Sequence, residues 1–354
     1  MRPIYIPGHK RGVTCVTFNQ DGDLLFTSGQ DGMIQAFKSN SGARLGTYHI
    51  RARGALVSPS VTQLDVTYDS ARLLAISADY SAYVFDVETG EMLSKVEETG
   101  AGMSGEWCRH PGQNRFMMAV HAFMDAPHNI KVYDWDADTA QYIKTLELPG
   151  FASRVTRCAW GPFDEYIISA HEDGFLRLWD AKTLAMVKEV SAHDKEIRGL
   201  AFNRNRTLMV SCSPDQKAHL WSLPNLEKVR TYSADRPLNG ASVSPLLHEM
   251  DIEKIMCPVF DNLEGEELVS DMLIKPHLLL GGGQERDQVT TSAEEGKFEG
   301  MLWHLNHAKC LGQMGGHFGP INTLCFMPDG RGYASGGEEG YVRIYHFDEQ
   351  YDGL

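Results

Sequence analysis

The chain has 354 residues, of which 42% are hydrophobic, and its 33 basic and 47 acidic residues give a net charge of −14. Such an excess of acid repels phosphate backbones, so we expect no direct binding to nucleic acid. The seven cysteines are scattered and form no Cys-x-x-Cys pair, which favours a reducing, cytoplasmic location. No stretch reaches the roughly 18 apolar residues of a membrane-spanning helix and no targeting segment is visible, so we expect no membrane contact.

A short apolar segment, Ile4-Tyr5-Ile6, is the first predicted strand and precedes a unit that recurs along the chain. The unit consists of an apolar strand, a turn, a second strand ending in Ser or Thr, an acidic-Gly turn, and a third strand ending in an aromatic residue. Its clearest copy covers residues 155–180, where apolar and polar residues alternate as they do in half-buried strands. We therefore predict that β-strands dominate the fold.

Seven copies of this unit follow one another. A looser third copy ends at residues 130–134, and an interrupted sixth copy ends at residues 301–303. In the other five copies an acidic residue precedes the terminal aromatic by six positions, at Asp31 and Phe37, Asp79 and Phe85, Asp173 and Trp179, Asp215 and Trp221, and Glu339 and Tyr345.

The spacing of the units indicates the fold. The terminal aromatics at positions 37, 85, 133, 179 and 221 lie 42 to 48 residues apart, close to the roughly 40 to 45 residues of a four-stranded propeller blade. We predict an all-β protein with a single seven-bladed β-propeller and four antiparallel strands per blade. The segment at residues 4–6 would pair as the outer strand of the last blade and close the ring, which removes open sheet edges.

The propeller is predicted to cover residues 1–348, with a short C-terminal tail at 349–354. In the sixth blade, residues 246–275 separate two predicted strands and carry eight acidic residues against two lysines. A solvated acidic loop is one interpretation of this insertion. A docking segment is the other, because apolar pairs at 255–256 and 259–260 interrupt the charges.

Gly-His pairs stand before the first and seventh units, at Gly8-His9 and Gly316-His317, and Ala192-His193 is closely related to them. Together with the acidic turns, these pairs resemble the WD-repeat family. The resemblance implies that His, the Ser or Thr of the second strand, the Asp of the turn and the terminal Trp form a hydrogen-bonded chain. The candidate network residues are His193, Ser211, Asp215 and Trp221 in the fifth blade, His9, Thr27 and Asp31 in the first, Ser169, Asp173 and Trp179 in the fourth, and His317, Ser335 and Glu339 in the seventh.

These residue types suit a chain of hydrogen bonds. A carboxylate accepts from one imidazole N–H, the other imidazole nitrogen takes the hydroxyl proton, and the hydroxyl oxygen accepts from the indole N–H. Only the fifth blade has all four types. Phe37 and Tyr345 replace Trp, and Phe151 stands where the fourth blade would carry His. We expect these blades to depend more on packing.

Several further motifs follow one another in the last third of the chain. They are residues 236–239, 280–285, 289–291, 296–299, 316–322 and 335–344. In this order they resemble the family of i subunits of eukaryotic translation initiation factor 3. The resemblance implies a non-enzymatic scaffold that supports assembly of the initiation machinery on the small ribosomal subunit.

In that family a long helix of the b subunit lies across neighbouring blades, and the g subunit is a second contact. The resemblance therefore implies protein partners, namely the b and g subunits, and no obligate homo-oligomer. It places candidate partner-binding residues on the rim of the fifth blade, at Asn205, Leu220 and Ser222. Acidic residues are usual near two of these places, so Asn205 and Ser222 depart from the family pattern.

Two other functions stay open. A WD-repeat adaptor that reads a peptide or a phosphorylated tail would need a basic pocket, and no basic cluster is visible in the sequence. A propeller hydrolase would need convergent ionisable groups in the central channel. His193, Ser211 and Asp215 match a hydrolase triad by residue type, but the structural network explains the same three residues.

Two short patterns resemble ligand sites only superficially. The glycines at 281–283 lack the Lys and the following helix of a phosphate-binding loop. His304 and His307 have a spacing that would suit a metal site on a helix, but they are predicted to lie where a strand runs into a turn. We therefore expect no catalytic residues, no cofactor and no metal.

Overall fold

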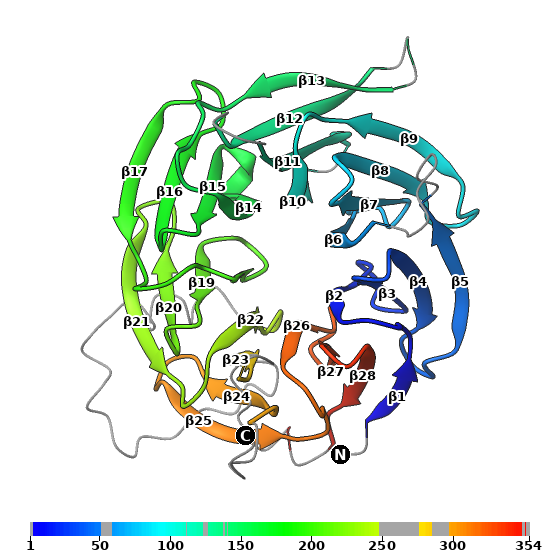
Figure 1. Ribbon diagram of the computed structural model, residues 1–354. Coiled ribbons are helices and arrows are strands. Elements are labelled where there is room, and N and C mark those ends of the chain that lie inside the picture. Colours follow the sequence, from blue (N-terminus) through cyan, green and yellow to red (C-terminus); the bar gives the residue numbers. More distant parts are fainter. Residues whose placement is uncertain are drawn as a thin grey trace.

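A ring of strands makes up the molecule (Figure 1). The computed structural model describes residues 3–50, 59–110, 112–122, 127–136, 139, 141–247, 276–284, 297–348 and 351. Within these ranges, 28 strands form seven four-stranded antiparallel sheets, which are the blades of the ring. The seven-bladed all-β propeller predicted from the repeat spacing is confirmed.

Six blades are built from strands that are consecutive in the chain. The first three are β2 (Val13–Phe18), β3 (Leu24–Gly29), β4 (Met33–Lys38) and β5 (Arg44–His49); β6 (Val61–Val66), β7 (Arg72–Ser77), β8 (Ser81–Asp86) and β9 (Met92–Glu97); and β10 (Ala101–Trp107), β11 (Arg115–His121), β12 (Asn129–Asp136) and β13 (Gln141–Glu147). The next three are β14 (Val155–Trp160), β15 (Tyr166–His171), β16 (Phe175–Asp180) and β17 (Met186–Ser191), with a 3-10 turn at Pro162–Asp164; β18 (Gly199–Phe202), β19 (Leu208–Cys212), β20 (Lys217–Ser222) and β21 (Glu227–Ser233); and β22 (Leu238–Val243), β23 (His277–Gly282), β24 (Gly300–His304) and β25 (Lys309–Met314).

The seventh blade joins the two ends of the chain. It contains β26 (Ile321–Phe326), β27 (Gly332–Gly337) and β28 (Tyr341–His346), and its outer strand is β1 (Ile4–Pro7). β1 pairs antiparallel with β28, with Ile4 opposite Ile344 and Ile6 opposite Val342. The predicted closure of the ring by the N-terminal strand is confirmed.

The hydrophobic core is divided among the spaces between neighbouring blades. One cluster, for example, joins Leu208 and Leu220 of the fifth blade to Leu278 and Trp303 of the sixth. Because the middle strands of a blade meet neighbours on both faces, they are buried on both faces and read as nearly continuous apolar runs. The second strand of the second blade, β7, shows this pattern, since only its first residue is partly exposed.

The first strands of the blades form the inner wall of the ring. Each of β2, β6, β10, β14, β18, β22 and β26 contacts the first strands of both neighbouring blades. The segments that follow these strands therefore gather at one end of the channel, and we call this end the channel mouth. Residues that are far apart in the sequence meet there.

The sixth blade and the tail are described only in part. Most of the predicted acidic insertion at 246–275 lies outside the described residues, but β22 and β23 on either side of it are adjacent, with Val243 opposite Leu278. Of the predicted tail at 349–354, only Tyr351 is described. Its buried ring stacks on Phe347 with centroids 3.8 Å apart, so Tyr351 packs against the propeller.

Candidate functional site

In the fifth blade, the four candidate network residues lie within hydrogen-bond distance of one another. Nδ1 of His193 lies 2.9 Å from the Asp215 carboxylate, and Nε2 lies 2.8 Å from Oγ of Ser211. The indole N–H of Trp221 donates to the same Oγ at 2.9 Å. Burial lowers the pKa of His193 and outweighs the opposing effect of the Asp215 carboxylate. The imidazole is therefore neutral at pH 7 and accepts the Ser211 hydroxyl proton.

The first and seventh blades hold the same arrangement without the indole. Phe37 has no polar atom to offer, and the Tyr345 hydroxyl donates to the carbonyl of Gly315 at 3.1 Å instead. In the first blade, His9 lies 3.1 Å from Asp31 and 2.9 Å from Thr27. In the seventh blade, His317 lies 2.5 Å from Glu339 and 2.7 Å from Ser335.

The fourth blade differs from the predicted chain. Trp179 donates to Ser169 Oγ at 3.0 Å, but the imidazole beside that hydroxyl belongs to His171, at 2.9 Å. His171 lies two residues after Ser169 on β15, so it points to the same face, and Phe151 packs edge-on against it. Asp173 does not join this chain and pairs with Arg177 at 3.0 Å. The fourth blade thus keeps a polar network, where we had predicted dependence on packing.

In the fifth-blade trio of His, Ser and Asp, the Ser211 hydroxyl is buried, whereas His193 and Asp215 line a cavity of ≈ 340 Å³. The Ser211 residue is 0% exposed, and the Asp215 carboxylate accepts the backbone N–H of Lys217 at 2.9 Å in addition to the His193 contact. A nucleophile must be reachable by its substrate, so this geometry supports a structural role for the trio. It does not support the hydrolase interpretation of these three residues.

Removing the shared hydroxyl should destabilise the fifth blade. Ser211→Ala is expected to cost about 1–3 kcal/mol, because it leaves Nε2 of His193 and the Trp221 indole N–H buried without a partner. Urea unfolding followed by intrinsic fluorescence measures the cost. Ser335→Ala is the matched control, because the terminal aromatic of its blade, Tyr345, bonds elsewhere and only one partner is stranded. An equal or larger cost for the control would contradict the account.

The three candidate partner-binding residues do not share one surface. Asn205 is exposed in the turn between β18 and β19, and Ser222 is 9% exposed at the end of β20. The two turns are joined, since the backbone N–H of Leu223 donates to the carbonyl of Thr207 at 2.8 Å. Leu220 is 0% exposed and belongs to the core between the fifth and sixth blades, so the prediction that it contacts a partner is wrong. As the third strand of its blade, β20 presents such side chains to the neighbouring blade.

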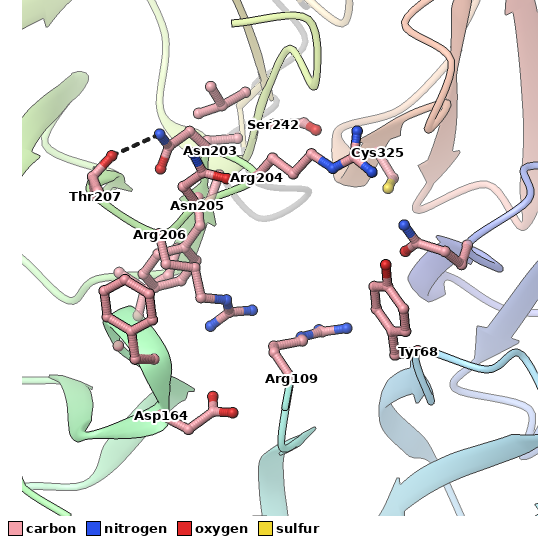
Figure 2. Close-up of a pocket in the computed structure, with 18 of the residues that line it drawn as sticks. Tyr68, Arg109, Asp164, Asn203, Arg204, Asn205, Arg206, Thr207, Ser242 and Cys325 are labelled. Carbon is pink, nitrogen blue, oxygen red and sulfur yellow. Dashed lines mark hydrogen bonds between the residues drawn. The ribbon is translucent and has the colours of Figure 1, made fainter. Parts of the chain in front are cut away.

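A cavity of ≈ 790 Å³ opens at the channel mouth (Figure 2). Asn205 lines it, so this part of the fifth-blade rim borders the cavity. Both polar and apolar side chains line its wall. They include Arg109, Arg204 and Arg206 on the polar side and Leu200, Phe202 and Leu324 on the apolar side.

Behind this wall lies a buried cluster of ion pairs that sequence reasoning missed. Glu106 of β10 accepts from Arg206 of the fifth blade, with an Nη1 to Oε2 distance of 3.1 Å, and from Arg109 at 2.9 Å. Arg109 also donates to Asp65 of the second blade at 3.0 Å. The backbone N–H of Trp160 in the fourth blade donates to Glu106 at 2.8 Å. Glu106 therefore connects the third, fourth and fifth blades, and Arg109 extends the cluster to the second.

Electrostatics keeps Glu106 charged. Burial would raise the pKa of Glu106, but the guanidinium groups of Arg206 and Arg109 outweigh it and lower the pKa to about 2. Burial raises the pKa of Asp65, whose nearest guanidinium is shared with Glu106. One signal in the sequence was available: Asp65 and Glu106 are both the penultimate residues of first strands, so they occupy equivalent places in their blades.

The glycine and histidine patterns have packing explanations. A Cβ added to Gly282 would lie 1.9 Å from the carbonyl oxygen of Pro237, so this position needs glycine for close packing. The rings of His304 and His307 lie 4.5 Å apart. Among the residues that the structure describes, no three His, Cys, Asp or Glu side chains gather in a way that could hold a metal ion. The described ranges also contain no helix with the length and apolar character to cross a bilayer.

The seven blades and their His-centred polar networks define a WD-repeat propeller. The WD domain, G-beta repeat family matches residues 2–38, 141–180, 185–222 and 308–346. These ranges include the inner three strands of the first, fourth, fifth and seventh blades, which hold the His-centred networks.

Similarity to characterised proteins extends over the full length. The chain is 36% identical over 358 residues to eukaryotic translation initiation factor 3 subunit I of Xenopus tropicalis, which covers 99% of this chain and 98% of the relative. It is 35% identical over 356 residues to the Homo sapiens protein of that name, with the same coverage. The Nematostella vectensis protein is 34% identical over 355 residues, or 100% of this chain and 99% of the relative. The chain belongs to the family of eukaryotic translation initiation factor 3 subunit I.

Proposed function

We propose that this chain is a non-enzymatic scaffold subunit of eukaryotic translation initiation factor 3. It supports assembly of the initiation machinery on the small ribosomal subunit through contacts with the b and g subunits, and it acts in the cytoplasm without obligate homo-oligomerisation. The observation that carries this proposal is the full-length identity of 34% to 36% with relatives of that name. The burial of Ser211 is a second support, because a buried hydroxyl leaves the His193, Ser211 and Asp215 trio to hold the fold.

The rim of the fifth blade is the proposed binding site for a helix of the b subunit. Helix capture needs a few apolar anchors beside polar contacts. After Ser222, the carbonyl of Asn225 accepts from Lys188 of β17 at 2.8 Å, so the outer strand of the fourth blade adjoins this rim. Met186 and Val187 on that strand are 52% and 55% exposed. These two side chains are the proposed anchors, and the polar rim lies next to them.

A bulky cation on the rim should weaken this contact. Asn205→Arg is expected to reduce affinity for the b subunit by about tenfold, because it places a long charged side chain on the surface that the helix covers. Titration of the purified variant with the b subunit, followed by fluorescence anisotropy, measures the change.

Asn40→Arg is the matched control, since Asn40 is an exposed asparagine in a turn of the first blade. It should bind like the unmodified chain. Full affinity in Asn205→Arg, or equal losses in both variants, would remove the fifth-blade rim from the proposal.

A further inference from the structure

Three arginine side chains meet at the channel mouth, although no basic cluster was visible in the sequence. Arg109 follows β10 in the third blade, and Arg204 and Arg206 lie in the turn between β18 and β19. Figure 2 shows all three side chains extending into the same open space. In a protein of net charge −14 this is a local concentration of basic side chains. A ligand that carries negative charge would complement it.

The arginines differ in how far their charges are compensated. Arg206 donates to both carboxylate oxygens of Glu106. Arg109 uses a single nitrogen, Nη2, for Asp65 and Glu106, and its buried Nε has no hydrogen-bond partner within the described residues. Arg204 is exposed, and no ion pair links it to another residue of the described ranges. Arg204, and the outer guanidinium nitrogen Nη1 of Arg109, whose side chain is 34% exposed, are therefore the donors that a ligand can reach.

Three carboxylates lie near the three arginines of the mouth. Asp65 and Glu106 are buried behind the arginines, and each is 7% exposed. One oxygen of Asp164 accepts the backbone N–H of His110 at 2.7 Å, and the other oxygen is buried. The two buried carboxylates Asp65 and Glu106 hold Arg109 and Arg206 in place, so Arg204 is the arginine of the mouth whose charge is not paired within the described residues.

The same cavity has apolar walls. Leu200 and Phe202 of β18 and Leu324 of β26 line it. The guanidinium of Arg206 lies 4.6 Å from the ring centroid of Phe202, which fixes both groups. The volume of ≈ 790 Å³ falls within the roughly 300–1,000 Å³ typical of sites for compact ligands. Such a site accommodates a few side chains, and its walls favour a ligand that is partly apolar.

We propose that the channel mouth binds a short acidic peptide segment of a partner protein. One carboxylate pairs with Arg204 and a second accepts from Nη1 of Arg109, while an intervening aliphatic side chain packs against Phe202 and Leu324. The combination of guanidinium donors with apolar walls distinguishes such a segment from RNA, which the net charge of −14 repels. This site adjoins the proposed rim contact with the b subunit, because Asn205 lines the cavity, but it does not depend on the identity of that partner.

Peptide titrations on the full-length chain test the proposal. A fluorescently labelled peptide of alternating leucine and glutamate is expected to bind, and its counterpart with glutamine in place of glutamate is expected to bind at least about tenfold more weakly. Arg204→Ala should weaken binding of the acidic peptide by about tenfold, since the Arg204 side chain supplies an uncompensated charge. Arg331→Ala is the matched control, because Arg331 is an exposed arginine of the β26–β27 turn outside the cavity.

Several outcomes would overturn the proposal. These are equal binding of the two peptides, no binding of either, unchanged affinity in Arg204→Ala, and equal losses in Arg204→Ala and Arg331→Ala. Tighter binding of labelled oligouridylate than of the acidic peptide would assign the mouth to RNA instead. The b-subunit titration is repeated on Arg204→Ala. Retained b-subunit affinity together with lost peptide binding separates this site from the rim contact, so either proposal can fail without the other.

Discussion

Glu106→Gln should destabilise the propeller by about 3–5 kcal/mol, the usual cost of removing one partner from a buried ion pair. The substitution takes the shared carboxylate away from Arg109 and Arg206 and weakens the contact with the backbone N–H of Trp160. Because these groups come from the third, fourth and fifth blades, the loss affects several blade interfaces at once. Urea unfolding at pH 7 measures the change.

The same variant has a predicted dependence on pH. The pKa of Glu106 is lowered from the model-compound value of 4.5 to about 2 in the folded chain. A carboxyl whose pKa is lowered by folding contributes stability above its unfolded pKa, and that stability is lost as pH falls toward the folded pKa. The difference in free energy of unfolding between the unmodified chain and Glu106→Gln should therefore have its full value above pH 4.5 and decrease below that pH. Acids outside the cluster titrate alike in both chains and cancel, whereas the charge of Glu106 contributes to the raised pKa of Asp65, so the difference reports on Glu106 together with Asp65.

Glu165→Gln is the control for this experiment. Glu165 lies 3.7 Å from Lys182 in a pair whose side chains are 55% and 79% exposed. An exposed pair of this kind contributes at most about 1 kcal/mol. If Glu106→Gln cost no more than Glu165→Gln, or if its cost stayed constant from pH 7 to pH 3, the ion cluster would not have the role assigned to it.

The second large loss of stability is expected when closure of the ring by β1 is disturbed. Ile6→Ala is expected to cost about 2–5 kcal/mol, because Ile6 is buried in the core that joins the first and seventh blades. Deleting residues 1–7 should cost at least as much, since it also removes the pairing of β1 with β28. Calorimetry should show a lower Tm, and the freed edge of β28 should promote association on gel filtration.

Val187→Ala serves as the control for ring closure. Val187 is an aliphatic residue on the outer strand β17 and is 55% exposed, so its loss should change stability by no more than about 0.5 kcal/mol. A deletion of residues 1–7 that left the Tm unchanged would show that β1 does not hold the ring closed.

The sequence predicted the blades better than it predicted the groups between them. The spacing of terminal aromatics depends on local strand and turn lengths, so it identified the second and third blades even where their motifs were weak. The fourth-blade network was harder to predict, because Phe151 stands at the position where other blades carry histidine. The imidazole is supplied instead by His171 on the second strand. The strand pattern of the fourth blade does not show whether its histidine lies before the first strand or on the second.

Contacts across the ring were not visible in the sequence. Glu106 and Arg206 are 100 positions apart and meet only because the first strands of several blades end at one mouth. Leu220 was misassigned for a related reason: a third strand alternates in sequence like any strand, but its neighbours bury both faces. Local pattern therefore indicates the blade, whereas exposure and ion pairing depend on how the blades are packed.

Affinity purification of the tagged protein from its own cytosol tests the central claim most directly. The scaffold account predicts that initiation factor 3 subunits, including b and g, are recovered in fixed proportion to the tagged chain and remain bound through washes that remove transient partners. Recovery of the tagged chain without these subunits, or together with a different complex of constant composition, would contradict the account and favour a WD-repeat adaptor.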